Sequence, residues 1–242
     1  MENLEKKETI LKKAVVILSG GMDSVTTLYK AIADKYEVYA ISFDYGQKHS
    51  LEILAAEKIA SAANILSYEI IRLQKVLKGT SPLVNSYSEV KKYRKIEDMP
   101  LGIEDTFVPS RNSLFLTIAM NRAAVLNCSH IYLGVSQVDY GGYPDCRELY
   151  LQKISDALNL GIFGEDKEKW IKVETPFLHL SKKETVLLAA SLHGCLEALA
   201  YSHTCYNGEY PPCGQCHSCL LRMKGFEEAG ILDPILKRGE KV

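Results

Sequence analysis

The stretch AVVILSGGMDSVTT, residues 14–27, decides the fold of this chain. It begins with an apolar run typical of a buried β-strand, residues 14–18, and continues into a loop, residues 19–24, that holds two glycines, two serines and one aspartate. Glycines after a strand let the backbone turn tightly, and the N-terminus of the helix that follows presents free N–H groups and the positive end of its dipole. The pattern predicts a strand–loop–helix unit that binds an anion such as a phosphate group.

This loop contains no lysine, which separates it from the phosphate-binding pattern G-x-x-x-x-G-K-[ST]. It places Asp23 beside the expected phosphates instead, where a carboxylate can help to hold Mg²⁺. The other interpretation is a glycine-rich turn that binds nothing. The loop resembles S-G-G-x-D-S, the signature of the PP-loop ATP pyrophosphatases, at every fixed position. The resemblance implies that the loop grips the β,γ-pyrophosphate of ATP and that ATP is cleaved between the α- and β-phosphates.

Short β-rich runs alternate with helical patterns along the first 200 or so residues. The sequence predicts strands over 14–18, 37–43, 67–73, 130–135 and 170–175, and helices over 24–33, 48–63, 112–126, 145–160 and 181–192. Such alternation implies a parallel sheet with helices on both faces and a ligand at the carboxyl ends of the strands. We therefore expect an α/β fold, the Rossmann-like adenine nucleotide alpha hydrolase (PP-loop) fold, with segment 79–106 as an insertion or mobile flap over the ligand edge.

Four of the seven cysteines crowd into the C-terminal stretch TCYNGEYPPCGQCHSC, residues 204–219. Four thiolates at this spacing can surround one tetrahedral Zn²⁺ in a closed, structural site, and the ligands are Cys205, Cys213, Cys216 and Cys219. The rival interpretation is an iron–sulphur cluster, although the fourth cysteine and proline of ferredoxin-type runs are absent. Because four cysteines complete the shell, we expect His217 to be exposed.

Composition and charge narrow the class of protein. The chain has 242 residues, of which 47% are hydrophobic and 24% charged, with a formal net charge of −1. This near-neutral balance gives no argument for nucleic-acid binding, and neither a membrane span nor a signal peptide is visible. We expect a cytoplasmic protein with no membrane or nucleic-acid partner. Its expected parts are a leader (1–13), an ATP-binding α/β domain (14–200) and a zinc-binding C-terminal subdomain (201–242).

Five further blocks narrow the family. They are FDYGQKH (43–49), TFVPSRN (106–112), DYGGYPDCR (139–147), LSKKET (180–185) and TCYNG (204–208). With the loop and the cysteine tail, they resemble the 7-cyano-7-deazaguanine synthases of queuosine biosynthesis over about residues 14–225. One departure is Ser110, where that family commonly has glycine; the change removes no chemical group.

The resemblance implies an ATP-dependent ligase with small-molecule substrates. It would convert 7-carboxy-7-deazaguanine and ammonia to 7-cyano-7-deazaguanine by adenylating first the carboxylate and then the amide, as a homodimer with one Zn²⁺ per chain and Mg²⁺ accompanying ATP. The negative charge that develops in such a reaction needs fixed cations and Mg²⁺. The catalytic candidates are Asp23, Arg111, Arg147 and Lys182. The residues expected to bind ATP are Leu18, Ser19, Gly20, Gly21, Met22, Asp23, Ser24, Val25, Thr26, Thr27, Leu28 and Asp44.

The block at 139–147 is the candidate for recognising the base. A deazaguanine presents its N1–H and 2-amino group as a donor pair, which one carboxylate can accept in bidentate fashion. We expect Asp139 or Asp145 to accept that pair and Tyr140 or Tyr143 to stack on the ring. Arg147 is expected to face the 7-carboxylate. Because Pro144 precedes it, Asp145 has an alternative role as a carboxylate at a helix start.

Two other functions stay open at this point. The first is a different PP-loop enzyme, such as a tRNA thiolase or an amidotransferase-type synthetase. The second is a nucleotide-binding module whose cysteine knuckle contacts nucleic acid. No redox cysteine pair is clear, and basic and aromatic residues do not interleave around the cysteines, so the sequence favours the ligase.

Overall fold

Five parallel strands form the central sheet of the computed structural model, which describes residues 12–47, 49–85, 87–100, 102–138 and 143–238. The strands are β1 (Lys13–Ile17), β2 (Glu37–Asp44), β3 (Ser67–Arg72), β4 (His130–Tyr132) and β5 (Lys172–Glu174). Their order across the sheet is β3-β2-β1-β4-β5, and every neighbouring pair is parallel. The strand order reverses between β1 and β4, which is the edge position at which open α/β sheets bind ligands.

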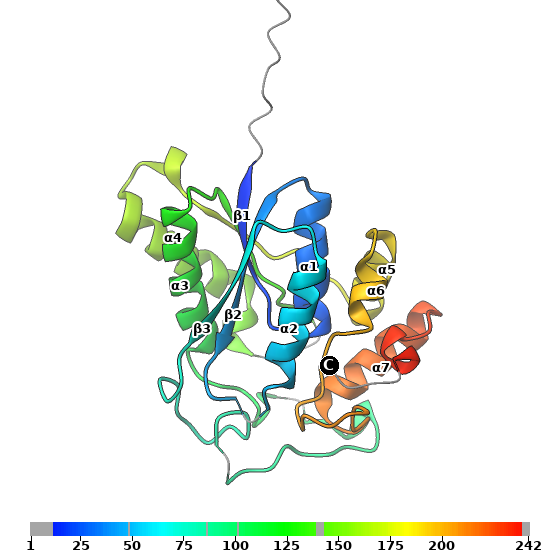
Figure 1. Ribbon diagram of the computed structural model, residues 1–242. Helices are drawn as coiled ribbons and strands as arrows, with labels where there is room; N and C mark the ends of the chain where they lie inside the picture. The colour runs from blue at the N-terminus through cyan, green and yellow to red at the C-terminus, as the bar shows by residue number, and fades with distance from the viewer. Residues whose placement is uncertain (1–11, 48, 86, 101, 139–142, 239–242) are drawn as a thin grey trace, which may run out of the picture.

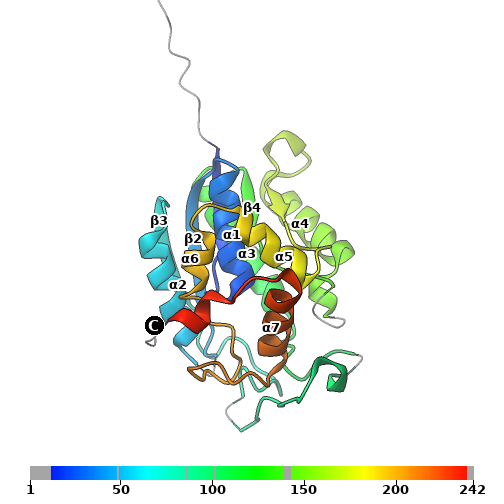
Figure 2. The same ribbon diagram turned by 90° about the vertical axis from the view of Figure 1, so that its right-hand side faces the viewer.

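Helices cover both faces of this sheet (Figures 1 and 2). They are α1 (Met22–Ala33), α2 (Leu51–Ala62), α3 (Arg111–Val125), α4 (Glu148–Phe163), α5 (Lys182–Ser191), α6 (Cys195–Leu199) and α7 (His217–Ala229). Strand β1 is buried on both sides, and its side chains alternate between two cores. Val16 packs with α1, α2, α5, α6 and α7, whereas Val15 packs with α3 and α4. The predicted fold class and all five predicted strands are confirmed.

Several boundaries differ from those expected. β1 already includes Lys13, which we had expected to be the last residue of the leader, and residues 1–11 lie outside the described part of the chain. β4 ends at Tyr132 rather than at residue 135, because Gly134 packs against the first turn of α1. Helix α4 begins at Glu148, after a 3₁₀ turn at Pro144–Cys146. Helices α6 and α7 were not predicted.

Segment 79–106 lies against the cysteine tail; both are drawn below the sheet in Figure 1. Its described part contains one short 3₁₀ turn, Ile96–Asp98. The N–H of Tyr93 donates to the carbonyl of Gln215 at 2.8 Å. Oε1 of Glu104 lies 2.9 Å from Nδ1 of His217, and both side chains are buried. The expectation of an exposed His217 was therefore wrong, because this segment covers it.

No helix in the described ranges is both long and apolar enough to cross a membrane. The longest of them, α4, has 16 residues, and several of these are exposed and charged.

Candidate functional site

The loop between β1 and α1 is held open by its own hydroxyl groups. The Ser24 hydroxyl accepts the Gly20 N–H at 3.1 Å and donates to the Gly21 carbonyl at 2.9 Å. The Ser19 hydroxyl donates to Ser24 Oγ at 3.0 Å and is itself exposed. Helix α1 begins directly afterwards, at Met22. These internal hydrogen bonds thus fix the shape of the loop, which leads into the N-terminus of α1.

Asp23 and Lys182 are brought together at this loop. The ammonium of Lys182 donates to both carboxylate oxygens of Asp23 at 2.9 Å, across 159 residues of sequence. The Lys182 side chain is only 7% exposed and the Asp23 side chain 12%. Lys182 is the first residue of α5, and a capping box between Ser181 and Glu184 fixes that helix start. The loop, which has no lysine of its own, therefore receives one from a distant helix.

A cavity opens over the loop at the carboxyl ends of β1 and β4. Of the expected site residues, those that line it are Leu18, Ser19, Gly21, Met22, Asp23, Ser24, Arg111, Tyr143, Lys182 and Cys205. Its walls also carry aromatic rings, among which Phe43 and Phe115 stack with their centroids 4.1 Å apart and Tyr45 lies 5.5 Å from Phe115. Such a cavity suits a flat, apolar ring next to an anion.

Arg111 and Glu52 bring opposite charges to the cavity. Burial alone would lower the pKa of the Arg111 guanidinium, but Tyr45, Tyr206 and Asp145 raise it above its ordinary value, so the group stays charged. Burial raises the pKa of the Glu52 carboxyl to about 7, although the charge of Arg111 opposes the rise. Both residues line the same cavity as Asp23 and Lys182.

Of the block at 139–147, the structure describes residues 143–147, of which Tyr143 and Cys146 line the cavity. Asp139 and Tyr140 fall outside the described residues. Tyr143 is buried at the cavity wall, and its hydroxyl lies 2.5 Å from Oγ1 of Thr106. Asp145 is buried near Arg111 and accepts the backbone N–H of Asn112, close to the start of α3, so it is not among the lining residues. Arg147 follows the 3₁₀ turn, is exposed, and donates to the carbonyl of Gln137 at 3.4 Å.

Some expected ATP-binding residues lie behind the loop rather than at the cavity. Val25, Thr26, Thr27 and Leu28 are buried in the body of α1. Asp44 accepts the Gly46 N–H at 3.3 Å and the Gln74 side chain at 3.2 Å. Gly20 is buried as well, and its positive φ of 89° gives it a conformational role. Fewer residues of this region therefore line the cavity than we expected to bind ATP.

Cys146 also lines the cavity, but its thiol is not activated. Burial and the neighbouring Asp145 raise the pKa of the Cys146 thiol to about 12. A thiol with this pKa is protonated at neutral pH and is a poor nucleophile. The reaction expected from the resemblance uses free ammonia and needs no thiol.

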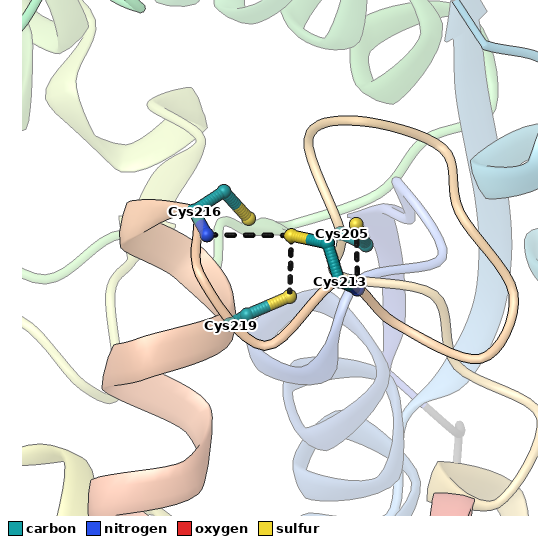
Figure 3. A group of neighbouring side chains, drawn as sticks. All are labelled: Cys205, Cys213, Cys216 and Cys219. Atoms are coloured by element: carbon teal, nitrogen blue, oxygen red, sulfur yellow. Dashed lines mark hydrogen bonds between the residues drawn. The ribbon is translucent and has the colours of Figure 1, made fainter. Parts of the chain in front are cut away.

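The four expected metal ligands converge (Figure 3). The Sγ atoms of Cys205, Cys213, Cys216 and Cys219 all lie within 4.8 Å of one another. The Cys216 N–H and the Gln215 N–H donate to Cys213 Sγ at 3.3 and 3.4 Å, an arrangement that stabilises a thiolate. Sulfur atoms about 2.3 Å from one tetrahedral Zn²⁺ would stand about 3.8 Å apart. Cys213 Sγ and Cys219 Sγ lie 3.9 Å apart, so the donor set fits a closed tetrahedral site.

Sequence reasoning missed two charged groups of the cavity, Glu52 and Arg222. Arg222 lies on α7 and is buried; its guanidinium binds both carboxylate oxygens of Asp233, at 2.6 and 2.8 Å, and the hydroxyl of Ser202 at 2.8 Å. Glu52 lies in the first turn of α2, directly after the FDYGQKH block, and that position was the available signal. No local pattern marks Arg222.

Fold and site together define the class of protein: an α/β protein of the PP-loop type, with a glycine-rich loop at the switch point of a parallel sheet. The family described as Queuosine biosynthesis protein QueC matches residues 13–230, and the chain belongs to that family.

Two relatives resemble the chain along nearly its whole length. A 7-cyano-7-deazaguanine synthase from Gloeobacter violaceus is 44% identical over 229 residues, which cover 94% of this chain and 97% of that protein. Another 7-cyano-7-deazaguanine synthase, from Chromobacterium violaceum, is 45% identical over 232 residues, or 94% of each chain. Among solved structures, the NH3-dependent NAD synthetase from Campylobacter jejuni has a TM-score of 0.42 and 18% identity and covers 78% of this chain and 68% of that chain.

Proposed function

We propose that this chain is a 7-cyano-7-deazaguanine synthase, which uses ATP to convert 7-carboxy-7-deazaguanine and ammonia to the 7-nitrile. The observation that carries the proposal is that Arg111 and Glu52 line the same cavity as the glycine-rich loop after β1, called the nucleotide loop below. Family membership supports the reaction, because the relatives named above carry this name over nearly their whole length.

The ATP phosphates are assigned to the loop. Ser19 and the N-terminus of α1 would donate hydrogen bonds, and the Lys182 ammonium would neutralise charge as pyrophosphate leaves. Each carboxylate oxygen has two lone pairs, so Asp23 can accept Lys182 and still offer lone pairs to Mg²⁺. When bound, Mg²⁺ would supply further positive charge for the phosphates. Asp44, whose carboxylate accepts the Gly46 N–H, would contribute to ATP binding only at the edge of the site, next to the nucleoside.

The deazaguanine is assigned to the aromatic part of the cavity. Its ring would pack against Tyr143 and Phe115, and its 7-carboxylate would face Arg111. Arg111 thus takes the role of facing the 7-carboxylate, which we had expected for Arg147; Arg147 is exposed. Adenylation would make one carboxylate oxygen a leaving group for ammonia, and a second activation of the amide oxygen would give the nitrile.

The base edge needs a carboxylate acceptor. We propose Glu52 as a third candidate for that role, in addition to Asp139 and Asp145. Glu52 lines the cavity, whereas Asp145 does not. A substrate that lacks the 2-amino group should lose much of its kcat/KM with the native protein, because the acceptor is left unpaired. Replacing the true acceptor by alanine should narrow the gap between the two substrates. If Glu52→Ala, Asp139→Ala and Asp145→Ala all leave the gap unchanged, the base is read elsewhere.

The proposal includes a homodimer in the cytoplasm with one Zn²⁺ per chain held by the four cysteines. Light scattering of the purified protein measures the mass of the particle; the proposal expects twice the chain's 27.0 kDa. A tRNA thiolase or another PP-loop synthetase remains the second candidate, favoured only by the shared loop.

Release of AMP from ATP tests the proposal. We expect AMP release to require both 7-carboxy-7-deazaguanine and ammonium, and Asp23→Asn to lower turnover, because the charge beside the phosphates is lost while the backbone loop survives. Asp156→Asn, on the exposed side of α4, is the control. AMP release that ignores the deazaguanine, or an Asp23→Asn protein with full activity at saturating ATP and Mg²⁺, would contradict the assignment.

A further inference from the structure

Helix α7 has a notch at Gly225, and the stem of Lys182 lies in it. A Cβ atom built at Gly225 would stand 2.4 Å from Cγ of Lys182 and 3.1 Å from both its Cβ and its carbonyl oxygen. Heavy atoms in contact do not come this close, so any side chain at Gly225 would push Lys182 away. Cγ is the second atom of the side chain and the carbonyl is backbone, so neither can move aside cheaply.

The notch holds the part of the Lys182 side chain that precedes its ammonium group. From α5, the Lys182 side chain crosses Gly225 and reaches both oxygens of Asp23 at 2.9 Å. Both helices are fixed independently of this contact. The capping box holds the start of α5. Helix α7 carries the expected metal ligand Cys219 in its first turn, and its Arg222, one turn before Gly225, binds the buried Asp233 that follows the helix. A displacement of the stem would therefore move the ammonium rather than the helices.

We propose that Gly225 is a positioning residue for ATP: its missing side chain seats the Lys182 stem so that the ammonium group reaches the nucleotide loop. The cysteine-anchored helix thereby becomes a wall of the active site and not merely a folded tail. This inference rests on the proposed function, since it needs ATP to bind at that loop.

A matched pair of glycine variants tests the inference. Gly225 and Gly161 both lie inside helices, so alanine improves the helix propensity of each by the same amount. A Cβ atom at Gly161 meets nothing within 4 Å. We expect Gly225→Ala to raise the dissociation constant for ATP and the KM for ATP about tenfold, as the loss of one charge-assisted hydrogen bond would. The KM for 7-carboxy-7-deazaguanine should stay unchanged, and Gly161→Ala should behave as the native protein.

A double-mutant cycle separates positioning from a general packing defect. If Gly225 acts through Lys182, Gly225→Ala should not weaken ATP binding further in a Lys182→Ala protein, because the displaced group is already gone. A folded Gly225→Ala protein with native ATP affinity overturns the inference. The same tenfold loss in both the native and the Lys182→Ala backgrounds also overturns it.

Insolubility of Gly225→Ala would still give a result. Lys182→Ala should then restore soluble protein to Gly225→Ala, whereas Lys183→Ala, at the exposed neighbouring lysine, should not. Lys182→Ala removes the Cγ atom, which makes the shortest contact at 2.4 Å, so failure to restore any soluble protein would contradict the Cγ contact on which the inference rests. A native protein that binds no ATP would instead refute the proposed function, which is a different outcome from native ATP binding that Gly225→Ala leaves intact.

Discussion

At the residue scale, the two glycines of the nucleotide loop have different roles. Gly20 has a φ of +89°, and a Cβ atom there would stand 2.1 Å from the backbone oxygen of Glu52. Gly21 has no left-handed backbone, and the nearest atom to its Cβ would be Ser19 Oγ at 3.5 Å. The first glycine therefore allows the loop to pass α2, while the second leaves room for a ligand.

Alanine at each position should separate these roles. We expect Gly20→Ala to lower the melting temperature strongly, because both the conformation and the space forbid a side chain. Gly21→Ala should fold with a nearly native melting temperature and lose ATP affinity, since its methyl group points where phosphate approaches. Thermal unfolding and ATP titration measure the two effects. Equal melting temperatures for the two variants would show that the loop is not held against α2.

Ser110 departs from the family pattern at a position where the structure favours glycine. It precedes α3 with a φ of 62°, in the left-handed region, and its side chain makes no capping hydrogen bond. The left-handed conformation destabilises the folded state by about 1–2 kcal/mol at a non-glycine residue. A glycine avoids this strain, but its greater conformational entropy stabilises the unfolded chain by about 0.4–1 kcal/mol. The turn before Arg111 is therefore strained in this protein.

Ser110→Gly should raise the free energy of unfolding by about 0.5–1 kcal/mol, the difference between those two terms. Asn127, at the other end of α3, has a φ of 55° and belongs to the residue types that tolerate this region. Asn127→Gly is thus the control and should give no gain. Chemical denaturation of both variants measures the difference, and a destabilised Ser110→Gly protein would argue against strain at this turn.

At the element scale, segment 79–106 packs as a wall of the cysteine tail. Buried Glu104 contacts buried His217, whereas its neighbour Asp105 pairs with Lys91 on the surface, where the two side chains are 59% and 61% exposed. Buried partners are costly to remove, while exposed ion pairs contribute little. The segment should therefore owe its position to Glu104 far more than to Asp105.

Glu104→Ala should lower the free energy of unfolding by about 1–3 kcal/mol, because it removes the carboxylate partner of a buried imidazole. Asp105→Ala should cost less than about 0.5 kcal/mol. Protease cleavage within 79–106 provides a local readout and should accelerate in Glu104→Ala only. Similar values for both variants would mean that the segment is a mobile flap after all.

The elements could be predicted to the extent that their patterns are local. Apolar runs such as residues 14–18 identify strands whatever surrounds them, and the glycine-rich loop that follows predicts the start of a helix, which is α1. Helix α7 escaped prediction because cysteines dominate its start, and its buried face includes Arg222. The orientation of Arg147 depends on one 3₁₀ turn, and the contact of Glu104 with His217 joins residues 113 positions apart; neither leaves a local pattern.

At the scale of the whole molecule, the tail and the sheet share one site. Cys205 is both an expected metal ligand and a lining residue of the cavity, and α7 reaches from the cysteines to Lys182. Tails of this length seldom fold on hydrophobic burial alone, so metal binding would supply folding free energy. Loss of the metal should then disturb both the tail and the nucleotide site.

We expect about one zinc per chain by elemental analysis, and no visible absorption from an iron–sulphur cluster. Cys216→Ser should lose the metal and melt at a lower temperature, because three thiolates hold Zn²⁺ poorly. Cys128→Ser is the control, as Cys128 is equally buried but lies outside the cysteine cluster. A stable, zinc-free and fully active Cys216→Ser protein would refute a structural metal.

The most direct measurement follows the nitrogen of ¹⁵N-ammonium into the product. The purified protein is incubated with ATP, Mg²⁺, 7-carboxy-7-deazaguanine and labelled ammonium, and the base is analysed by mass spectrometry. We predict that 7-cyano-7-deazaguanine forms with the label in its nitrile, and only when ATP is present. A base that keeps its carboxylate while ATP is consumed, or a nitrile without the label, would contradict the assignment of this chain as the synthase.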